Sequence, residues 1–193
     1  MASRELLPSN YERLEYIENT SKAYINTGIG ASHFDKVYCK MIIVDKVGRW
    51  DTIWGTRLGN YSNARCLYVY NGDMFWFNHG SYNRVSNIPC VFGKMYEILY
   101  NNGTYTINGK TETVVGGNPQ STNPCYIFVN NTGGKPDNTY IKAKIFDFKM
   151  YKGETIVLSL IPVRRKSDGV IGMYDLVGRK FYTSPNGVAF TGG

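Results

Sequence analysis

The alternation of apolar and polar residues predicts β-strands along most of this chain. Period-two alternation is typical of half-buried strands, because successive side chains of a strand point to opposite faces. We expect thirteen strands, at 23–28, 36–44, 51–56, 66–70, 74–78, 94–101, 103–107, 110–115, 125–129, 141–151, 155–163, 170–175 and 180–183. So many short strands exceed what one twisted open sheet usually holds, so the predicted fold class is all-β, a two-sheet antiparallel jelly-roll sandwich.

Turn residues punctuate this pattern. Asn-Gly pairs at 71–72, 102–103 and 108–109 lie between alternating runs, and both central residues of a type I′ hairpin turn need a positive φ that Asn and Gly tolerate. Stretches rich in Gly, Pro and Asn at 115–124 and 130–138 are expected to be long surface loops.

One segment has a helical rather than a strand pattern. Residues 9–18 place Tyr11, Leu14 and either Tyr16 or Ile17 near helical spacing, which predicts one short N-terminal helix. The three glutamates of this segment, at 12, 15 and 18, are then expected to face solvent on that helix. The length of 193 residues fits one domain, spanning residues 1–193.

Composition agrees with a globular, mostly β protein. The chain is 42% hydrophobic and 19% charged, which excludes disorder as its main state, and it contains 16 Tyr and 21 Gly. The N-terminal residues contain no apolar signal-peptide core, and no long apolar run predicts membrane insertion. The four cysteines have no CxxC spacing and are expected to be reduced core thiols.

The net charge of +7 is concentrated near the C-terminus, where residues 135–193 hold ten Lys/Arg against five Asp/Glu. The run Arg164-Arg165-Lys166 could bind phosphate, but it is short and distant in sequence from the aromatic strands. We therefore expect a solvated strand end here and no nucleic-acid partner.

The residues that catalysis requires are poorly represented. No two acidic residues stand at i and i+2, the spacing that aligns carboxylates on one strand of a glycan-cleaving sandwich enzyme. A cross-strand pair of Glu97 with Glu112 remains open, as does a dyad of Cys90 with His79. No nucleophile elbow, P-loop or dinucleotide motif is present, so the chain is predicted not to be an enzyme.

Metal binding has one weak candidate. The two histidines, His33 and His79, lack a zinc spacing. Calcium sites use oxygen ligands from loops without a strict motif, so Asp137 with Asn138 could hold Ca²⁺, although a turn-forming role is the preferred interpretation. No other cofactor is expected.

Two neighbouring strands, 66–70 and 74–78, predict an aromatic surface. Alternation places the aliphatic and phenylalanine side chains, at 67, 69, 75 and 77, on one face that suits the core. The opposite face then carries Tyr68, Tyr70, Trp76 and Asn78. Flanking candidates, expected to lie in loops, are Arg57, Asn60, Tyr61 and His79. Flat rings beside amide and guanidinium donors suit sugars, and the alternative is that a loop or another chain covers these rings.

Two terminal segments carry a family resemblance. LLPSNYERLEYIENTSKAYINTGI and KIFDFKMYKGETIVLSLIPVRRKSDGVIGMYDLVGRKFYT resemble modules in tail and minor structural proteins of phages and prophages of gut bacteria. Those modules are similar to the concanavalin A-like lectin/laminin G superfamily, a two-sheet jelly roll whose terminal strands lie together. The resemblance is most specific at 14–18, 23–28 and 161–183 and looser at 48–124.

The resemblance implies a non-catalytic module that binds glycans or a host surface receptor within a phage tail or a bacterial surface protein. Other tail or surface modules, or further copies of the chain, are then expected partners. The first alternative is a structural or assembly module whose outward aromatic residues are buried against another subunit. The second is a glycan-cleaving enzyme. The chain lacks the acidic loop cluster of calcium-dependent members.

Overall fold

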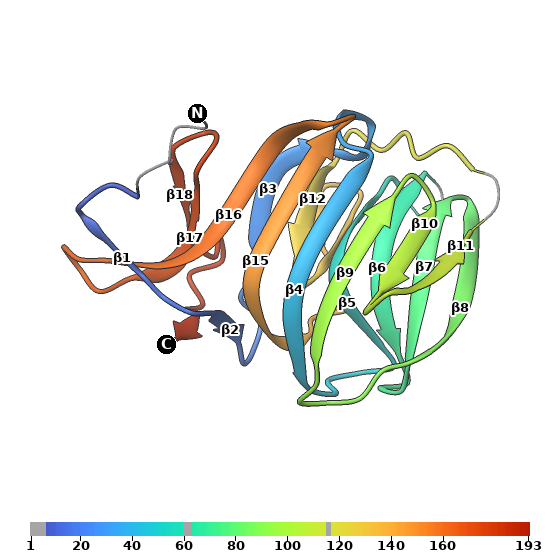
Figure 1. The fold of residues 1–193 in the computed structure, drawn as a ribbon, viewed down its shortest axis with the longest axis horizontal. Helices are drawn as coiled ribbons and strands as arrows, with labels where there is room; N and C mark the ends of the chain where they lie inside the picture. Colours follow the sequence, from blue (N-terminus) through green and yellow to red (C-terminus); the bar gives the residue numbers. More distant parts are fainter. Residues whose placement is uncertain (1–6, 60–62, 115–116) are drawn as a thin grey trace.

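Two β-sheets pack face to face, as the alternation predicts. The computed structural model describes residues 7–59, 63–114 and 117–193. In Figure 1, strands β15, β4 and β9 of one sheet lie in front of β5, β6 and β7 of the other. Pairing is antiparallel in both sheets except between β13 and β5, which are parallel.

The first sheet, sheet A, has a main path of eight strands. In spatial order they are β11 (Lys110–Thr113), β10 (Thr104–Ile107), β9 (Met95–Asn101), β4 (Lys36–Asp45), β15 (Lys142–Lys152), β16 (Thr155–Arg165), β17 (Ile171–Asp175) and β18 (Lys180–Tyr182). Three short terminal strands join this path: β1 (Tyr11–Arg13), β2 (Ile17–Asn19) and β19 (Thr191–Gly192).

The second sheet, sheet B, carries the aromatic strands. In spatial order its strands are β14 (Lys135–Pro136), β13 (Asn130–Thr132), β5 (Trp50–Arg57), β6 (Ala64–Tyr70), β7 (Met74–Gly80) and β8 (Tyr82–Pro89). Two further strands are β12 (Pro124–Ile127), which pairs with β5, and β3 (Ile25–Gly30), which pairs with β12. One turn of 3₁₀ helix, η1 (Ala31–His33), follows β3.

The three Asn-Gly turns are confirmed as hairpins with positive φ at both residues. The angles are 53° and 83° at 71–72, 44° and 92° at 102–103, and 47° and 80° at 108–109. These turns connect β6 to β7, β9 to β10 and β10 to β11. The register of the aromatic hairpin is therefore set by its turn residues together with its alternation.

The predicted N-terminal helix at 9–18 is wrong. Strands β1 and β2 occupy this segment, pairing with β16 and β15. The Tyr11 ring packs 4.9 Å from Tyr174 and 5.2 Å from Phe181, measured between ring centroids. So short a helix is marginal in isolation, and pairing with existing strands satisfies the same backbone groups while burying the rings. Glu12 is also not on a helical face, because its carboxylate pairs with Arg164 at 2.9 Å.

Two other segments differ from expectation. Residues 82–89 form the edge strand β8, which we did not predict, since its exposed and polar side chains hide the alternation. The segment 130–138 is not a long loop but contains the hairpin β13–β14, and Gly133 and Gly134 take positive φ between the strands. The described part of the other predicted loop, 117–123, contains no strand.

The core lies between the sheets and is rich in rings. Trp54, Phe75, Phe77 and Tyr105 are fully buried, and the Phe77 and Tyr105 rings stack with centroids 3.9 Å apart. All four cysteines are free and buried, as predicted. No helix in the described part of the chain has the length and hydrophobicity needed to cross a bilayer.

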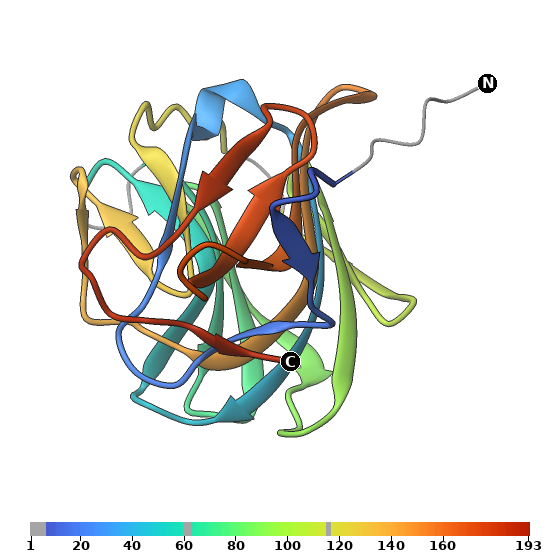
Figure 2. The same ribbon diagram turned by 90° about the vertical axis from the view of Figure 1, so that its left-hand side faces the viewer.

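The N-terminal and C-terminal strands lie together. Strand β19 pairs with β2, and Figure 2 shows the end of the chain running beside that early segment. This arrangement agrees with the one that the family resemblance implies.

Candidate functional site

The β6–β7 hairpin has the side-chain orientation that the alternation predicts. The four residues expected in the core, at 67, 69, 75 and 77, are at most 1% exposed and belong to the cluster between the sheets. Tyr68 and Trp76 instead pack with Trp50 in a separate cluster on the outer face of sheet B. The aromatic residues therefore point away from the main core, which is the condition on which the site prediction depends.

Trp50 is the centre of this outer cluster, and the alternation of apolar and polar residues did not identify it. Its ring centroid lies 4.8 Å from Trp76, nearly perpendicular at 83°, and 4.5 Å from Tyr70. The predicted strand began one residue later, and a bulge between Thr52 and Trp54 interrupts the alternation of β5. Pairing of Trp50 with Tyr70 across β5 and β6 was the signal that could have found it.

A small pocket, the outer-face pocket, opens among these rings. Its volume is about 60 Å³. It is lined by Trp50, Arg57, Tyr68, Trp76, Asn78 and Thr139. Four of these residues were predicted as ligand-binding candidates. The prediction of an open surface needs correction, because Tyr68 is only 3% exposed and Asn78 only 1%. The Trp50 ring packs against Tyr68, and both residues form buried pocket walls rather than an exposed platform.

Two polar atoms of this pocket have no hydrogen-bond partner in the protein. They are the hydroxyl of Tyr68 and Oδ1 of Asn78, both buried. The Cys66 thiol donates to Thr56 O and Asn130 Oδ1, and its sulfur, a weak acceptor, approaches the Tyr68 hydroxyl without the geometry of a hydrogen bond. Burial raises the pKa of Tyr68 well above its usual value, so the hydroxyl remains a neutral donor. Buried polar groups are rarely unpaired, so these atoms indicate a site that a ligand or water completes.

Arg57 borders the pocket within a polar network. Its Nε donates to Thr132 Oγ1 at 2.8 Å, and its Nη2 lies 3.3 Å from Asp137 Oδ2. The side chains of Arg57 and Asp137 are only 14% and 18% exposed, so the pair is largely screened from water. The positive charge at the pocket is therefore balanced by a carboxylate.

The same network bears on the calcium candidate. Asp137 Oδ2 also accepts from Asn130 Nδ2 and Thr132 Oγ1, and Oδ1 accepts from the backbone and hydroxyl of Thr139. Donors of the protein thus occupy both oxygens, while Asn138 is exposed. Residues 7–59, 63–114 and 117–193 contain no group of three or more His, Cys, Asp or Glu able to hold a metal ion. Asp137 acts as the organiser of its turn, the role preferred from the sequence.

His79 does not border the pocket, so this part of the site prediction is wrong. It lies in β7, one residue beyond Asn78, and alternation turns its ring inward, where it is 4% exposed. Its Nδ1 lies 2.8 Å from the Tyr100 hydroxyl. The remaining candidates, Asn60 and Tyr61, lie outside the described residues.

The structure does not assemble the catalytic pairs that were left open. Glu97 and Glu112 are on β9 and β11, with β10 between them, and their nearest charged partners are Lys40 at 3.8 Å and Arg84 at 3.6 Å. Burial raises the pKa of Cys90 to about 12, which makes it a poor nucleophile.

The basic run at 164–166 is used internally. Arg164 pairs with Glu12, Arg165 makes a bidentate contact with Asp168, and Lys166 Nζ donates to Ser9 O at 2.7 Å. The contacts of Arg164 and Lys166 hold the N-terminal segment against β16, and the Arg165–Asp168 contact closes the turn that follows β16. The run therefore lies at a partly exposed strand end, as the sequence favoured.

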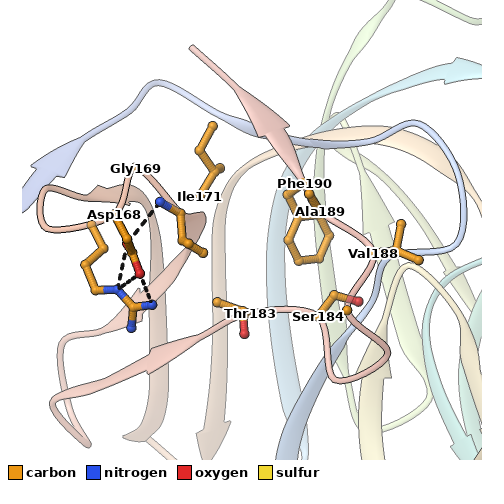
Figure 3. A pocket seen from close by; sticks show the side chains of 11 residues that line it. Asp168, Gly169, Ile171, Thr183, Ser184, Val188, Ala189 and Phe190 are labelled. Carbon is orange, nitrogen blue, oxygen red and sulfur yellow. Dashed lines mark hydrogen bonds and ion pairs between the residues drawn. The ribbon is translucent and has the colours of Figure 1, made fainter.

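Two larger pockets are not lined by any of the buried polar atoms that lack a hydrogen-bond partner in the described residues. One, of about 470 Å³, lies between β17 and the C-terminal segment and is shown in Figure 3. There Asp168 is held by Arg165, and the Ser184 hydroxyl accepts from Tyr24 N and donates to Asn186 Oδ1. The other, of about 540 Å³, adjoins η1, where Lys152 Nζ donates to Ser32 O. Volume alone would favour these two pockets, but of the three described here it is the outer-face pocket whose lining includes buried polar atoms without a hydrogen-bond partner.

Solved structures with the same architecture exist. The chain superposes on a "putative carbohydrate binding protein" from Bacteroides ovatus ATCC 8483 with a TM-score of 0.61 and 16% identity, covering 94% of this chain and 60% of that one. It superposes on the NanB sialidase of Streptococcus pneumoniae with a TM-score of 0.51 and 14% identity, covering 97% of this chain and 38% of that one. The chain matches no protein-family model and no curated protein sequence. At such identities the likeness shows a β-sandwich fold, and function must be argued from the site.

Proposed function

We propose that this protein is a non-catalytic carbohydrate-binding module whose ligand engages the outer-face pocket. The observation that carries the proposal is the pair of buried, unpartnered polar atoms, Tyr68 Oη and Asn78 Oδ1, among indole and phenol rings. Aromatic faces contact the C–H surface of sugars, while a few fixed polar groups bond their hydroxyl or amide substituents. The similarity to a protein described as carbohydrate-binding supports the same class of ligand.

The surroundings of the pocket extend the possible contact surface. Tyr70 lies beside Trp76 at 5.3 Å between centroids, and Arg49 donates to the Tyr70 hydroxyl at 2.6 Å. Arg49 is exposed and Tyr70 half-buried, so both can reach a sugar that projects from the pocket. Because the contact surface is small, we expect weak affinity at each site and function through several copies.

The assembly alternative requires these rings to be open to another protein. Trp50, Tyr70 and Trp76 are only half-exposed, because they cover one another. The geometry thus favours a small ligand over a subunit at this position.

The experiment is a glycan array followed by calorimetry on the wild type, Trp50→Ala and Trp76→Ala. Both variants should lose binding by at least about tenfold, because each removes a pocket wall. The matched control is Tyr82→Ala, which removes an aromatic ring that is 55% exposed on the edge strand β8 of the same sheet. Glycan binding that survives both tryptophan substitutions would place the ligand elsewhere. Sedimentation of the same samples, with a stable oligomer dissociated by the tryptophan substitutions, would instead support assembly.

We further propose that the module belongs to a phage tail or bacterial surface protein and recognises a surface glycan or receptor there. The resemblance of its two terminal segments to modules of phage tail proteins supports this setting. Mass spectrometry of purified virions and of surface-shaved cells would test it, and recovery of these peptides solely from the cytosolic fraction would contradict it.

A further inference from the structure

The outer-face pocket is too small for a sugar ring. Its volume of about 60 Å³ is a few times the roughly 10–15 Å³ that one enclosed water needs in the same measure. It therefore has room for one substituent of a sugar, with the ring remaining outside beside Tyr70. Selectivity at this site should depend on which substituent enters.

The unpaired atoms define the hydrogen bonds that this substituent must make. Tyr68 offers a hydroxyl proton, and Asn78 offers an amide whose Oδ1 is an acceptor. The two groups do not bond to each other, although both are buried in the same pocket. A substituent that carries one acceptor and one donor satisfies both.

The walls add an apolar requirement. The indoles of Trp50 and Trp76 meet nearly perpendicularly, with centroids 4.8 Å apart, and form an apolar corner. A hydroxymethyl oxygen could bond to Tyr68 and Asn78, but it would leave this corner unfilled. A methyl group in the corner gains the contacts that an empty apolar surface lacks.

Charge disfavours an acidic substituent. Arg57 is the cationic residue lining the pocket, and it lies 3.3 Å from Asp137. The carboxylate of Asp137 balances the guanidinium, so a second anion would meet little net positive charge. A carboxylate also has no proton for Asn78 Oδ1.

We propose that the outer-face pocket binds the acetamido group of an N-acetylated hexosamine: Tyr68 donates to its carbonyl oxygen, Asn78 Oδ1 accepts from its N–H, and its methyl group contacts Trp50 and Trp76. This inference rests on the proposed carbohydrate-binding function and narrows it to one class of sugar. It also explains why these two polar side chains are buried without partners in the protein.

The first test varies the ligand. N-acetylglucosamine, N-acetylgalactosamine and N-acetylmannosamine are each titrated by NMR against the parent hexose, the free-amine hexosamine and the N-propanoyl analogue. At least one acetylated sugar should bind about tenfold or more tighter than its parent, since a filled apolar corner and two bonds distinguish them. The N-propanoyl analogue should bind more weakly than the acetyl form, because its extra methylene must enter the same corner between Trp50 and Trp76. This comparison requires no protein variant.

The second test varies the protein. Tyr68→Phe removes the donor and retains the ring, and it should reduce the preference for the acetylated sugar to about twofold or less. Tyr182→Phe, which removes a phenol on β18 far from this hairpin, should leave the preference unchanged.

The outcomes separate the two proposals. If the parent hexoses bind as tightly as every acetylated sugar, the acetamido assignment is overturned while glycan binding stands. If an acetylated sugar is preferred and Tyr68→Phe does not alter the preference, the assignment to this pocket is overturned. If neither these sugars nor any array glycan binds, the carbohydrate-binding proposal itself fails.

Discussion

The hydroxyl of Tyr100 lies 2.8 Å from Nδ1 of His79, in the layer between the two sheets. His79 is 4% exposed, and the guanidinium of Arg65 is close enough to affect it electrostatically. Burial and the Arg65 charge lower the pKa of His79 from 6.5 to about 4. The folded protein thus holds this imidazole neutral at pH values where an unfolded chain would protonate it.

Acid should therefore destabilise the protein through His79. Between pH 6.5 and about 4 the unfolded state binds a proton that the folded state does not, so stability present above pH 6.5 is lost as the pH falls. The slope contributed by one such group is at most about 1.4 kcal/mol per pH unit. Urea denaturation at several pH values across this range should show that the unfolding free energy of the wild type falls with pH. The fall should be less steep in His79→Gln. His33→Gln, at the exposed histidine, is the control; an unchanged slope in His79→Gln would assign the acid sensitivity to other groups.

Arg65 should be replaceable without loss of stability. Arg65 is 4% exposed, and its guanidinium lies over the Phe34 and Tyr100 rings, at 4.8 and 5.4 Å from their centroids. Nε and Nη1 have no hydrogen-bond partner, so the cost of burying the charge is offset mainly by the rings. We expect Arg65→Met to have an unfolding free energy equal to the wild type or higher by about 1 to 2 kcal/mol.

The same substitution should alter the acid response. Removal of the Arg65 charge should raise the pKa of His79 toward 6.5, which narrows the pH range of acid destabilisation. Arg84→Met, at an exposed arginine that pairs with Glu112, should leave that range unchanged. A strongly destabilised Arg65→Met protein would show that the charge itself supports the core.

The fold was predictable where local chemistry and tertiary structure agree. The turn at Asn108-Gly109 and the alternation in β6 and β7 each specify a backbone conformation without reference to distant residues. The N-terminal strands were not predictable, because their partners in β15 and β16 are more than a hundred residues away. The positive φ of 74° at Phe128 was not predictable for the same reason, because its N–H bonds to Ile53 O in a strand distant in sequence.

The sequence predicted which face of sheet B carries the site residues, but it did not predict how deeply those residues are buried. Alternation placed Tyr68 and Asn78 on the outer face, but it did not reveal that Trp50 packs against Tyr68 there, because a bulge interrupts the alternation of β5. His79 was misplaced because it was taken as a loop residue, whereas β7 continues to Gly80 and turns the ring inward. The network around Asp137 required the folded arrangement of β5 and β13.

Substitution of Gly109 measures how much unfolding free energy is lost when a residue with a side chain must adopt a positive φ. Its φ is +80°, and a Cβ placed there meets no atom within 4 Å. Gly109→Ala should therefore lower the unfolding free energy by about 1 to 2 kcal/mol through conformation alone. Gly80 also has a positive φ, but its Cβ would lie 2.6 Å from Asn118 N, so Gly80→Ala should cost more. Urea denaturation compares them; equal losses would mean that the backbone near Gly80 yields at little cost.

Asp137 should link stability to ligand binding. Its two oxygens accept hydrogen bonds from Arg57, Asn130, Thr132 and Thr139, so Asp137→Asn replaces an acceptor by a donor among buried donors and removes the charge opposite Arg57. We expect the unfolding free energy to fall by about 2 to 4 kcal/mol, with weaker glycan binding because Arg57 loses its fixed position. Asp168→Asn makes the same change in an exposed Arg–Asp pair and should alter stability little.

Thermal unfolding with and without added calcium tests whether Asp137 binds this ion. Protein donors already occupy the carboxylate, so calcium should not raise the melting temperature. A calcium-dependent increase that Asp137→Asn abolishes would show that this carboxylate binds the ion.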